Sequence, residues 1–436
     1  MAGSVPYFSH SMDLFSKPMK DASVSSGFDH ISRATNLDSD SIEIKLEKDA
    51  MHYLKTDDTI LQGSFKITDN EGNDINEEDV VAPVNFFPCA LFESCEIFCN
   101  DVRISSTSHN SLPHKRMIEA LLSYGDDSER THLNLAMWHK DDETEKASEQ
   151  NATDKNGGFN SRTAFVAKSK ECNFIYWLQN DILNVDRYFP TDMKLRFVFH
   201  KNIPEWCLME GAISEARNTA RGGNFSYRIK LTSLSLHMRK VVPTPSLLAD
   251  HIQRLNKNQN MIYPYTRSKI SKFTQIKGAT AAYLPSVESG RLPTQMYLVM
   301  LKTSADLGDL KQNPFYYEHF DLNKALLAIN GQLLREYNCD FESDNYLDLV
   351  SELYRNCGVN NSNTPCIVSP YSFKRGHTII SWNLTPDKSN FMPSQNGNID
   401  IELNFKKPLP DNVTFIVLSL YDDTYLIDNL RNIIII

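Results

Sequence analysis

The sequence predicts an all-β fold made of two tandem antiparallel sandwiches, with short helices in the loops. Three observations support this prediction. Short segments alternate apolar and polar residues, tight-turn signals separate them, and the second half of the chain repeats the order of the first. The chain has 436 residues, of which 41% are hydrophobic and 23% are charged. This composition is typical of a globular protein, and the length is sufficient for two substantial cores.

In the first half, the alternation begins at residue 41. Residues 41–47 and 61–68 place apolar side chains at every second position, which is the period of a half-buried strand. Asn100 and Asp101 then separate two β-rich runs. Because both residue types tolerate positive φ, we predict a tight hairpin turn at these two residues.

A helix is predicted at 113–125, because apolar side chains recur there at helical spacing between a proline and a glycine. Residues 139–163 carry almost no apolar side chains, so we expect a long exposed polar insertion there. Alternation returns in three further strands, predicted at 172–178, 193–199 and 225–242.

The second half begins after a predicted linker helix within 242–262, a region marked by two prolines. Asn330 and Gly331 form a second hairpin signal, and a second helix is predicted at 345–358. Residues 399–405 then alternate as 193–199 do. Hairpin, helix and strand therefore recur in the same order.

The spacing of these repeats supports a duplication. Asn330 follows Asn100 by 230 residues, whereas Phe405 follows Phe199 by 206. The difference of 24 is about the length of the polar insertion at 139–163. Duplication of one β-domain, with an enlarged loop in the first copy, explains both spacings.

These observations predict a double jelly roll, because about 200 residues with long loops suit a jelly roll better than a compact immunoglobulin domain. Phe8, Leu14 and Phe15 are apolar anchors in a segment rich in Ser and Asp, which is interpreted as an assembly arm or as a frayed terminus. The predicted parts are an arm at 1–40, a first jelly roll at 41–241, a linker helix at 242–262 and a second jelly roll at 263–436.

Sequence motifs for catalysis are missing. The chain contains no phosphate-binding loop, no GxSxG, no HExxH and no HxH pair. Its eight cysteines include no CxxC pair, so buried free thiols are expected. The N-terminus lacks the pattern of a secretory signal, and no apolar run is long enough to span a membrane. We therefore expect no enzyme activity, no cofactor, no metal and no membrane insertion.

The chain is acidic, with 45 Lys and Arg against 55 Asp and Glu, which gives no electrostatic footprint for specific nucleic-acid binding. One segment leans basic and is interpreted as ordinary surface charge. Its residues are Arg217, Arg221, Arg228, Lys230, Arg239 and Lys240. The closing run at 431–436 is strongly apolar, so we expect it to pair in a sheet or to be buried at an interface.

Residues 82–141 carry a series of motifs that resembles the first-domain core of the major capsid proteins of Polintons (Mavericks) and adintovirus-like viruses. The matching motifs are Pro83-Val84-Asn85, Leu91-Phe92, Asn100-Asp101, Pro113-His114, Leu121 to Gly125, and Trp138. The resemblance continues in 11–18, 313–334, 399–423 and 427–436. Asp101 stands where the family usually has Gly, which makes the first hairpin turn less ideal.

The resemblance implies a structural major capsid protein with two jelly rolls side by side. Three chains would form a homotrimer with a pseudo-hexameric outline, and the trimers would form an icosahedral shell. Its implied partners are copies of itself and penton or minor capsid proteins, and its implied location is the virion, assembled inside the host cell. The insertion at 139–163 would form an exposed tower or a clasp between subunits.

Three alternatives stay open. A jelly-roll carbohydrate-binding protein would need exposed aromatic residues, and the chain has only four tryptophans, of which Trp177 and Trp382 lie in strand-like runs. A cupin-like metal enzyme would need converging His and carboxylate ligands. A host-domesticated, capsid-derived protein would keep the fold and lose assembly.

Overall fold

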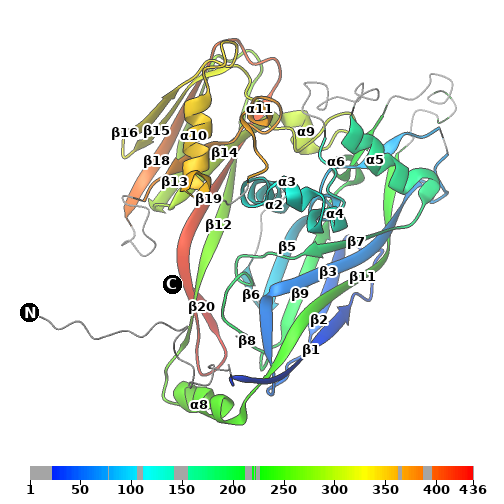
Figure 1. The fold of residues 1–436 in the computed structure, drawn as a ribbon, viewed down its shortest axis with the longest axis vertical. Coiled ribbons are helices and arrows are strands. Elements are labelled where there is room, and N and C mark those ends of the chain that lie inside the picture. The colour runs from blue at the N-terminus through cyan, green and yellow to red at the C-terminus, as the bar shows by residue number, and fades with distance from the viewer. Residues whose placement is uncertain are drawn as a thin grey trace, which may run out of the picture.

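The computed structural model describes residues 22–76, 78–105, 111–141, 156–211, 219, 221, 226–361, 366–385 and 395–435. The candidate arm anchors Phe8, Leu14 and Phe15 lie outside the described residues. Figure 1 shows two β-sandwiches standing side by side, with most of the helices at one end and a single helix, α8, at the other.

The first sandwich consists of two antiparallel sheets. One has the strand order β1-β11-β3-β7, with β8 pairing with β3, and the other has the order β2-β9-β5-β6. A short pair, β4 with β10, stands apart. The strands are β1 Val24–Arg33, β2 Ser41–Leu46, β3 Tyr53–Asp69, β4 Val81–Pro83, β5 Phe92–Cys99, β6 Val102–Ser105, β7 Cys172–Trp177, β8 Phe189–Pro190, β9 Leu195–Lys201, β10 Leu208–Glu210 and β11 Tyr227–Pro243.

The second sandwich also consists of two antiparallel sheets. Their orders are β12-β19-β14-β17, with β20 pairing with β19, and β13-β18-β15-β16. The closing apolar run therefore pairs in a sheet, as the sequence predicts. The strands are β12 Met261–Gln275, β13 Ala281–Arg291, β14 Gln295–Lys302, β15 Leu322–Ile329, β16 Gln332–Asn338, β17 Ile380–Asn383, β18 Asn396–Phe405, β19 Val413–Ile427 and β20 Ile433–Ile435.

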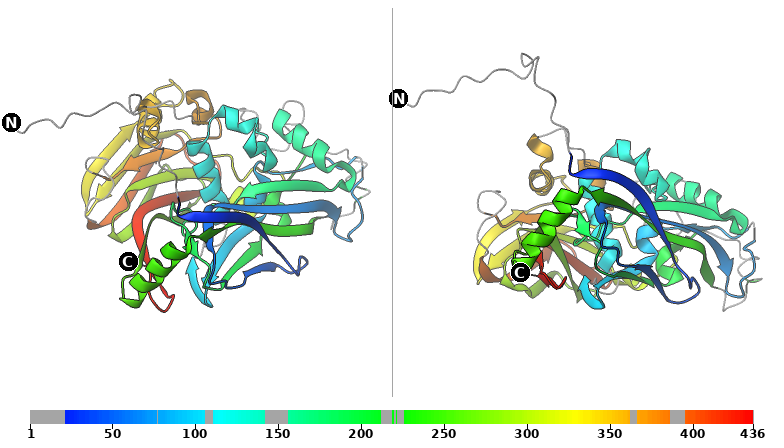
Figure 2. Two further views of the ribbon diagram at one scale, coloured as in Figure 1. Left: turned by 60° about the horizontal axis from the view of Figure 1, so that its bottom comes forward. Right: turned by 90° about the horizontal axis from the view of Figure 1, so that it is seen from below.

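The two sandwiches share one topology. We leave out the short strands β4, β8, β10 and β20 and number the remaining eight strands of each sandwich along the chain. The first sheet of both sandwiches then has the order first, eighth, third, sixth. The second sheet of both has the order second, seventh, fourth, fifth. The fold is a double jelly roll, and the prediction of this fold class is confirmed. The views in Figure 2 show the two sandwiches lying next to each other.

The alternation of the sequence sets the register of each core. In the first sandwich, Ile42 on β2 lies opposite Phe199 on β9, and both side chains are fully buried. In the second sandwich, Leu284 on β13 lies opposite Ile401 on β18, and both are again buried. Because side chains alternate between faces, a shift of one residue would expose every one of these apolar groups.

Helices occupy the loops between strands. α2 follows the β5–β6 hairpin and α10 follows the β15–β16 hairpin, while α8 lies in the chain between β11 and β12. The helices are α1 Phe87–Ala90, α2 Ser111–Ser123, α3 Asp126–Glu129, α4 His132–Leu135, α5 Gly157–Val166, η4 Ala167–Ser169, α6 Pro204–Cys207, α8 Pro245–Asn256, α9 Thr303–Leu307, α10 Leu347–Asn356, η5 Val359–Asn361 and α11 Pro370–Lys374.

The predicted arm at 1–40 is wrong for part of its length, because Val24–Arg33 form β1. This strand pairs with β11 from Val24 opposite Pro243 to Arg33 opposite Ser235. It lies at the edge of its sheet, and most of its side chains are exposed. A strand held mainly by backbone hydrogen bonds has no apolar alternation, which is why the sequence pattern missed it.

The predicted polar insertion at 139–163 is also wrong at its end, because α5 begins at Gly157. Asn156 caps this helix by accepting a hydrogen bond from the Phe159 amide at 3.1 Å. A Cβ on Gly158 would lie 2.2 Å from the Lys140 carbonyl oxygen, so only glycine fits there. The fully buried Arg162 side chain donates to the Pro83 carbonyl at 2.8 Å. Gly158 and Arg162 therefore hold α5 against the first sandwich, although this segment has few apolar side chains.

Candidate functional site

The described part of the chain contains no group of three or more His, Cys, Asp and Glu side chains that could hold a metal ion. Within the same residues, no helix has the length and apolar character needed to cross a membrane. All eight cysteines are free. Burial raises the pKa of Cys95 and of Cys99, both on β5, to about 12. These thiols stay protonated at neutral pH and are poor nucleophiles.

The two predicted hairpin turns have matching geometry. Asn100 and Asp101 have φ of 47° and 67°, and Asn330 and Gly331 have φ of 52° and 76°. Two consecutive residues with positive φ are the geometry of a type I′ turn. Each turn joins the fourth and fifth strands of its sandwich.

The first asparagine of each turn also makes the same pair of hydrogen bonds. The Asn100 amide donates to the Lys194 carbonyl at 2.9 Å, and the Lys194 amide donates to Asn100 Oδ1 at 3.1 Å. The Asn330 amide donates to the Asn398 carbonyl at 2.8 Å, and the Asn398 amide donates to Asn330 Oδ1 at 2.9 Å. The side chain thereby ties each turn to the chain of the neighbouring seventh strand, which explains an asparagine at both sites.

The junction between the sandwiches is centred on His114 at the start of α2. This ring is fully buried and lies 3.0 Å from Asp306 Oδ1 of α9 and 3.2 Å from the Tyr317 hydroxyl, both in the second sandwich. Lys272 Nζ lies 2.7 Å from the same carboxylate oxygen of Asp306. Trp206 Nε1 donates to the Asp306 carbonyl at 3.1 Å. Polar groups from both sandwiches thus converge on one aspartate.

Electrostatics fix the protonation states at this junction. Burial lowers the pKa of His114, although Asp306 opposes this shift. Burial alone would raise the pKa of Asp306, but hydrogen bonds from His114 and Lys272 outweigh it and lower the pKa to about 2. With an ionised Asp306 as acceptor, His114 Nε2 carries the proton and Nδ1 accepts from the Tyr317 hydroxyl.

A second buried ion pair lies one residue further along α2. Lys115 pairs with Asp181, and its side chain is only 6% exposed. The other carboxylate oxygen of Asp181 accepts from both the amide and the hydroxyl of Ser268 on β12, each at 2.7 Å. Asp181 therefore links a helix of the first sandwich to a strand of the second.

The junction continues to the α8 end of the molecule. The Tyr425 hydroxyl on β19 donates to the Ile182 carbonyl at 3.2 Å. Arg431 pairs with Asp192, and the Asn100 side-chain amide donates to the Arg431 carbonyl at 3.3 Å. Hydrogen bonds and ion pairs therefore join the two sandwiches from the His114 cluster to the α8 end.

The interpretation of the basic segment as ordinary surface charge is wrong for two residues. The Arg221 side chain is 4% exposed and pairs with Asp79 and Glu210. Lys240 is buried and lies 3.5 Å from Asp49. Asp79 lies 142 positions from Arg221, and Asp49 is also distant from Lys240 in the sequence, so composition alone could not identify these pairs.

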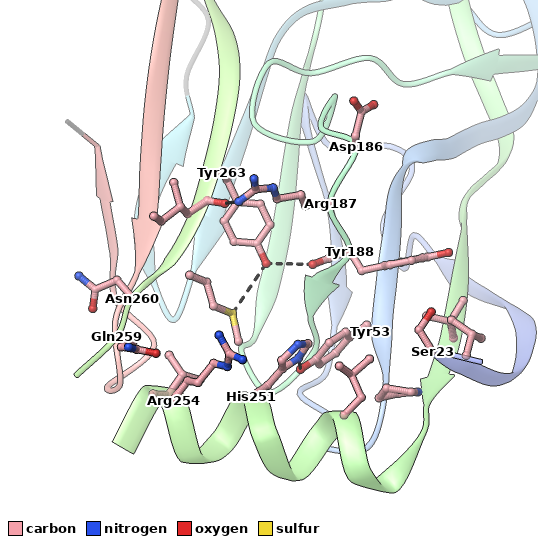
Figure 3. Close-up of a pocket in the computed structure, with 17 residues that line it drawn as sticks. Ser23, Tyr53, Asp186, Arg187, Tyr188, His251, Arg254, Gln259, Asn260 and Tyr263 are labelled. Carbon is pink, nitrogen blue, oxygen red and sulfur yellow. Dashed lines mark hydrogen bonds between the residues drawn. The ribbon is translucent and has the colours of Figure 1, made fainter. Parts of the chain in front are cut away.

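A cavity of about 580 Å³ opens between α8 and the start of β12 (Figure 3). Tyr53 and His251 form one wall, with parallel rings 5.7 Å apart and a 2.8 Å hydrogen bond between the hydroxyl and Nδ1. On another wall, the Tyr263 hydroxyl donates to the Tyr188 carbonyl at 2.9 Å. The sequence pattern did not single out this cavity, because its walls come from both sandwiches and from the connecting helix.

Large apolar side chains are exposed on both sandwiches, whereas the tryptophans are not. Trp138, Trp206 and Trp382 are at most 2% exposed, and Trp177 is half-buried. The exposed apolar groups include Phe28, Ile31, Tyr283, Leu333, Leu334, Ile434 and Ile435. Several of them lie on the edge strands β1 and β16 and on the terminal β20, which are positions open to another chain.

Comparison with known proteins gives one distant relative in sequence and several in structure. No protein-family model matches the chain. The uncharacterized protein F54H12.2 of Caenorhabditis elegans is 22% identical over 408 residues, which cover 90% of this chain and 92% of that protein.

The fold is similar to solved viral structures over nearly the whole chain. A structure of the Sputnik virophage has a TM-score of 0.63 at 13% identity, covering 100% of this chain and 93% of that chain. The Faustovirus major capsid protein has a TM-score of 0.57 at 8% identity, covering 94% and 92%. The mavirus major capsid protein has a TM-score of 0.54 at 10% identity, covering 100% and 95%. At these identities the likeness establishes the fold.

Proposed function

We propose that the chain is a structural major capsid protein that forms homotrimeric, pseudo-hexameric capsomers of an icosahedral viral shell. The observation that carries the proposal is the full-length match of a duplicated jelly roll to the mavirus and Faustovirus major capsid proteins. The finer assignment to Polinton or adintovirus-like viruses rests on the sequence motifs at 82–141.

The physical properties of the chain suit this role. Two sandwiches of one topology, locked by the His114 and Asp181 clusters, form a rigid unit with two similar lobes. Three such units around an axis present six similar lobes, which is a pseudo-hexagonal outline. Exposed apolar groups on edge strands supply surfaces for contacts between subunits, which remove such edges from water.

The proposal extends to the parts and partners of the chain. The first jelly roll would run from β1 to β11 and so include Val24–Arg33 of the predicted arm, and α8 would join it to the second jelly roll, which begins at β12. Partners would be further copies of the chain and penton or minor capsid proteins, in a virion assembled inside the host cell. The N-terminal segment would contribute to assembly through Phe8, which precedes Leu14 and Phe15 in the chain.

A second candidate is a host-domesticated protein that retains the fold without building particles. The observation that favours it is the relative in Caenorhabditis elegans, an animal, which matches over most of both chains. Three of the four tryptophans are buried, so the carbohydrate-binding alternative would have to rely on exposed tyrosines such as Tyr188 and Tyr283.

Negative-stain electron microscopy of the purified chain tests the proposal. Capsomers would appear as uniform particles with a pseudo-hexagonal outline. A field of small single-chain globules at micromolar concentration would contradict the capsomer and favour the domesticated candidate.

A further inference from the structure

We propose that the cavity between α8 and β12 is a docking site for the chain's own N-terminal segment, with Leu14 and Phe15 inserted in the same subunit. The docked peptide would be short, apolar at its centre and acidic at one flank. This inference does not depend on a capsid role, because it rests on the cavity and on the chain that leads to it.

The cavity has the size and lining of a binding site for such a peptide. Its volume of about 580 Å³ lies within the range of roughly 300–1,000 Å³ found for ligand pockets. Its apolar lining includes Val24, Val241, Pro243, Leu247, Leu255 and Met261. An apolar surface of this extent is stabilised when side chains displace water from it.

The direction of the described chain carries the segment to this cavity. Ser23 and Val24 line the cavity, and Val24 pairs with Pro243 at the end of β11. The Thr244 amide donates to the Ser23 carbonyl at 2.9 Å, directly before α8 begins. Because β1 is antiparallel to β11, the described chain, followed from β1 back to Ser23, runs in the direction that β11 takes into α8. Figure 3 shows Ser23 at the β11 end of the cavity.

The segment between Phe15 and Ser23 is long enough to reach the cavity and short enough to favour docking in the same subunit. Phe15 precedes Ser23 by eight residues, which span at most about 3.3–3.6 Å each when extended. A short flexible tether gives an effective concentration in the millimolar range, which favours the same subunit over a neighbouring one. Docking in the same subunit is therefore the arrangement that the geometry favours.

The segment and the cavity rim are chemically complementary. Asp13, Leu14 and Phe15 are consecutive, so one carboxylate flanks two large apolar side chains. Arg187 and Arg254 line the cavity. Arg187 donates to the Ile262 carbonyl and Arg254 pairs with Asp250 at 2.7 Å, and the remaining N–H groups of both guanidinium groups can face that carboxylate. Leu14 and Phe15 would bury their side chains against Leu247 and Met261.

Disulfide trapping in the full-length chain tests the inference. The double variant Phe15→Cys with Leu247→Cys should form an intrachain bond under mild oxidation, because a docked Phe15 would lie within disulfide distance of α8. The product should run at the single-chain mass on a non-reducing gel and should lose two titratable thiols relative to its reduced form. The matched control, Phe15→Cys with Leu333→Cys, places the second thiol on exposed β16 of the second sandwich and should not cross-link.

The accessibility of position 247 provides an independent measurement. In a Leu247→Cys chain, a maleimide should label the introduced thiol at least 10-fold more slowly than in the same chain carrying Leu14→Ser and Phe15→Ser. Interchain dimers in the trapping experiment would overturn docking in the same subunit. Cross-linking no greater than in the control, or equal labelling rates, would overturn the docking site itself.

Discussion

Helices α2 and α10 hold the same place in their sandwiches, between the fifth and sixth strands, yet they differ in burial. From Leu112 to Leu122, every side chain of α2 except Glu119 is buried. On α10, the buried residues form one face, which includes Leu349 and Leu353, and the opposite face is exposed.

The difference lies in what each helix contacts. α10 packs on its own sandwich, so its sequence has the usual amphipathic pattern. α2 lies between the two sandwiches, and its polar residues His114 and Lys115 pair with Asp306 and Asp181. Duplication supplied two similar lobes, and burial of one helix between them joins these lobes into a single body.

The largest expected effect comes from breaking this junction. Asp306→Ala would leave His114 and Lys272 without their shared carboxylate, and removal of one partner of a buried pair costs about 3–5 kcal/mol. We expect the free energy of unfolding, measured in urea, to fall by about that amount. The matched control is Asp348→Ala on the exposed first turn of α10, which should change it by less than about 0.5 kcal/mol. Equal effects of the two substitutions would contradict the special role of α2.

Acid should weaken the second sandwich and the junction together. Burial lowers the pKa of His319 to about 4 and also lowers that of His114, from the usual 6.5. Because the unfolded chain binds these protons first, stability is complete above pH 6.5 and falls as the pH drops towards 4. For His319 alone, the loss is about 2 kcal/mol at pH 5.

Thermal unfolding between pH 7 and pH 5 measures this loss. Burial also lowers the pKa of His377, to about 3, so His319→Gln removes one of several titrating groups and should partly flatten the pH dependence of the melting temperature. An unchanged pH dependence in this variant would exclude His319 as a source of the acid sensitivity.

The two hairpin asparagines should be equivalent. Asn100→Ala and Asn330→Ala each remove the acceptor for a backbone amide and place alanine at positive φ. Each substitution should lower the free energy of unfolding by about 1–2 kcal/mol, and the two losses should agree within about 0.5 kcal/mol. Urea denaturation of both variants measures these losses. A loss in only one variant would contradict the structural equivalence of the two hairpins.

The smallest expected effect concerns the second residue of each turn, which is Asp101 in the first hairpin and Gly331 in the second. Asp101→Gly should stabilise the first hairpin by a few tenths of a kcal/mol, because glycine adopts φ of 67° without a Cβ penalty. The reciprocal Gly331→Asp should destabilise the second hairpin by a similar amount. Melting temperatures of the two variants should therefore move in opposite directions, and shifts of the same sign would contradict this explanation.

Local sequence patterns were sufficient to predict much of the fold. The alternating residues of β2 and β9, the two hairpin turns and the helices α2, α8 and α10 all follow from periods and turn residues that act over a few positions. The duplication followed from their order. These features are encoded by neighbours in the chain, so they can be recognised without the tertiary structure.

The missed features depend on contacts between distant residues. His114 and Asp306 are separated by 192 positions, and Lys115 and Asp181 by 66, so no local pattern indicates that they pair. β1 is held by the backbone of β11 and lacks an apolar period. The α8 cavity likewise exists only where separate segments of the chain meet.

Light scattering coupled to size-exclusion chromatography tests the central claim most directly. At micromolar concentration, the purified full-length chain should elute as one species with three times the 49.8 kDa mass of a single chain. A monodisperse species at the single-chain mass would contradict assembly of the two-lobed subunit into a capsomer.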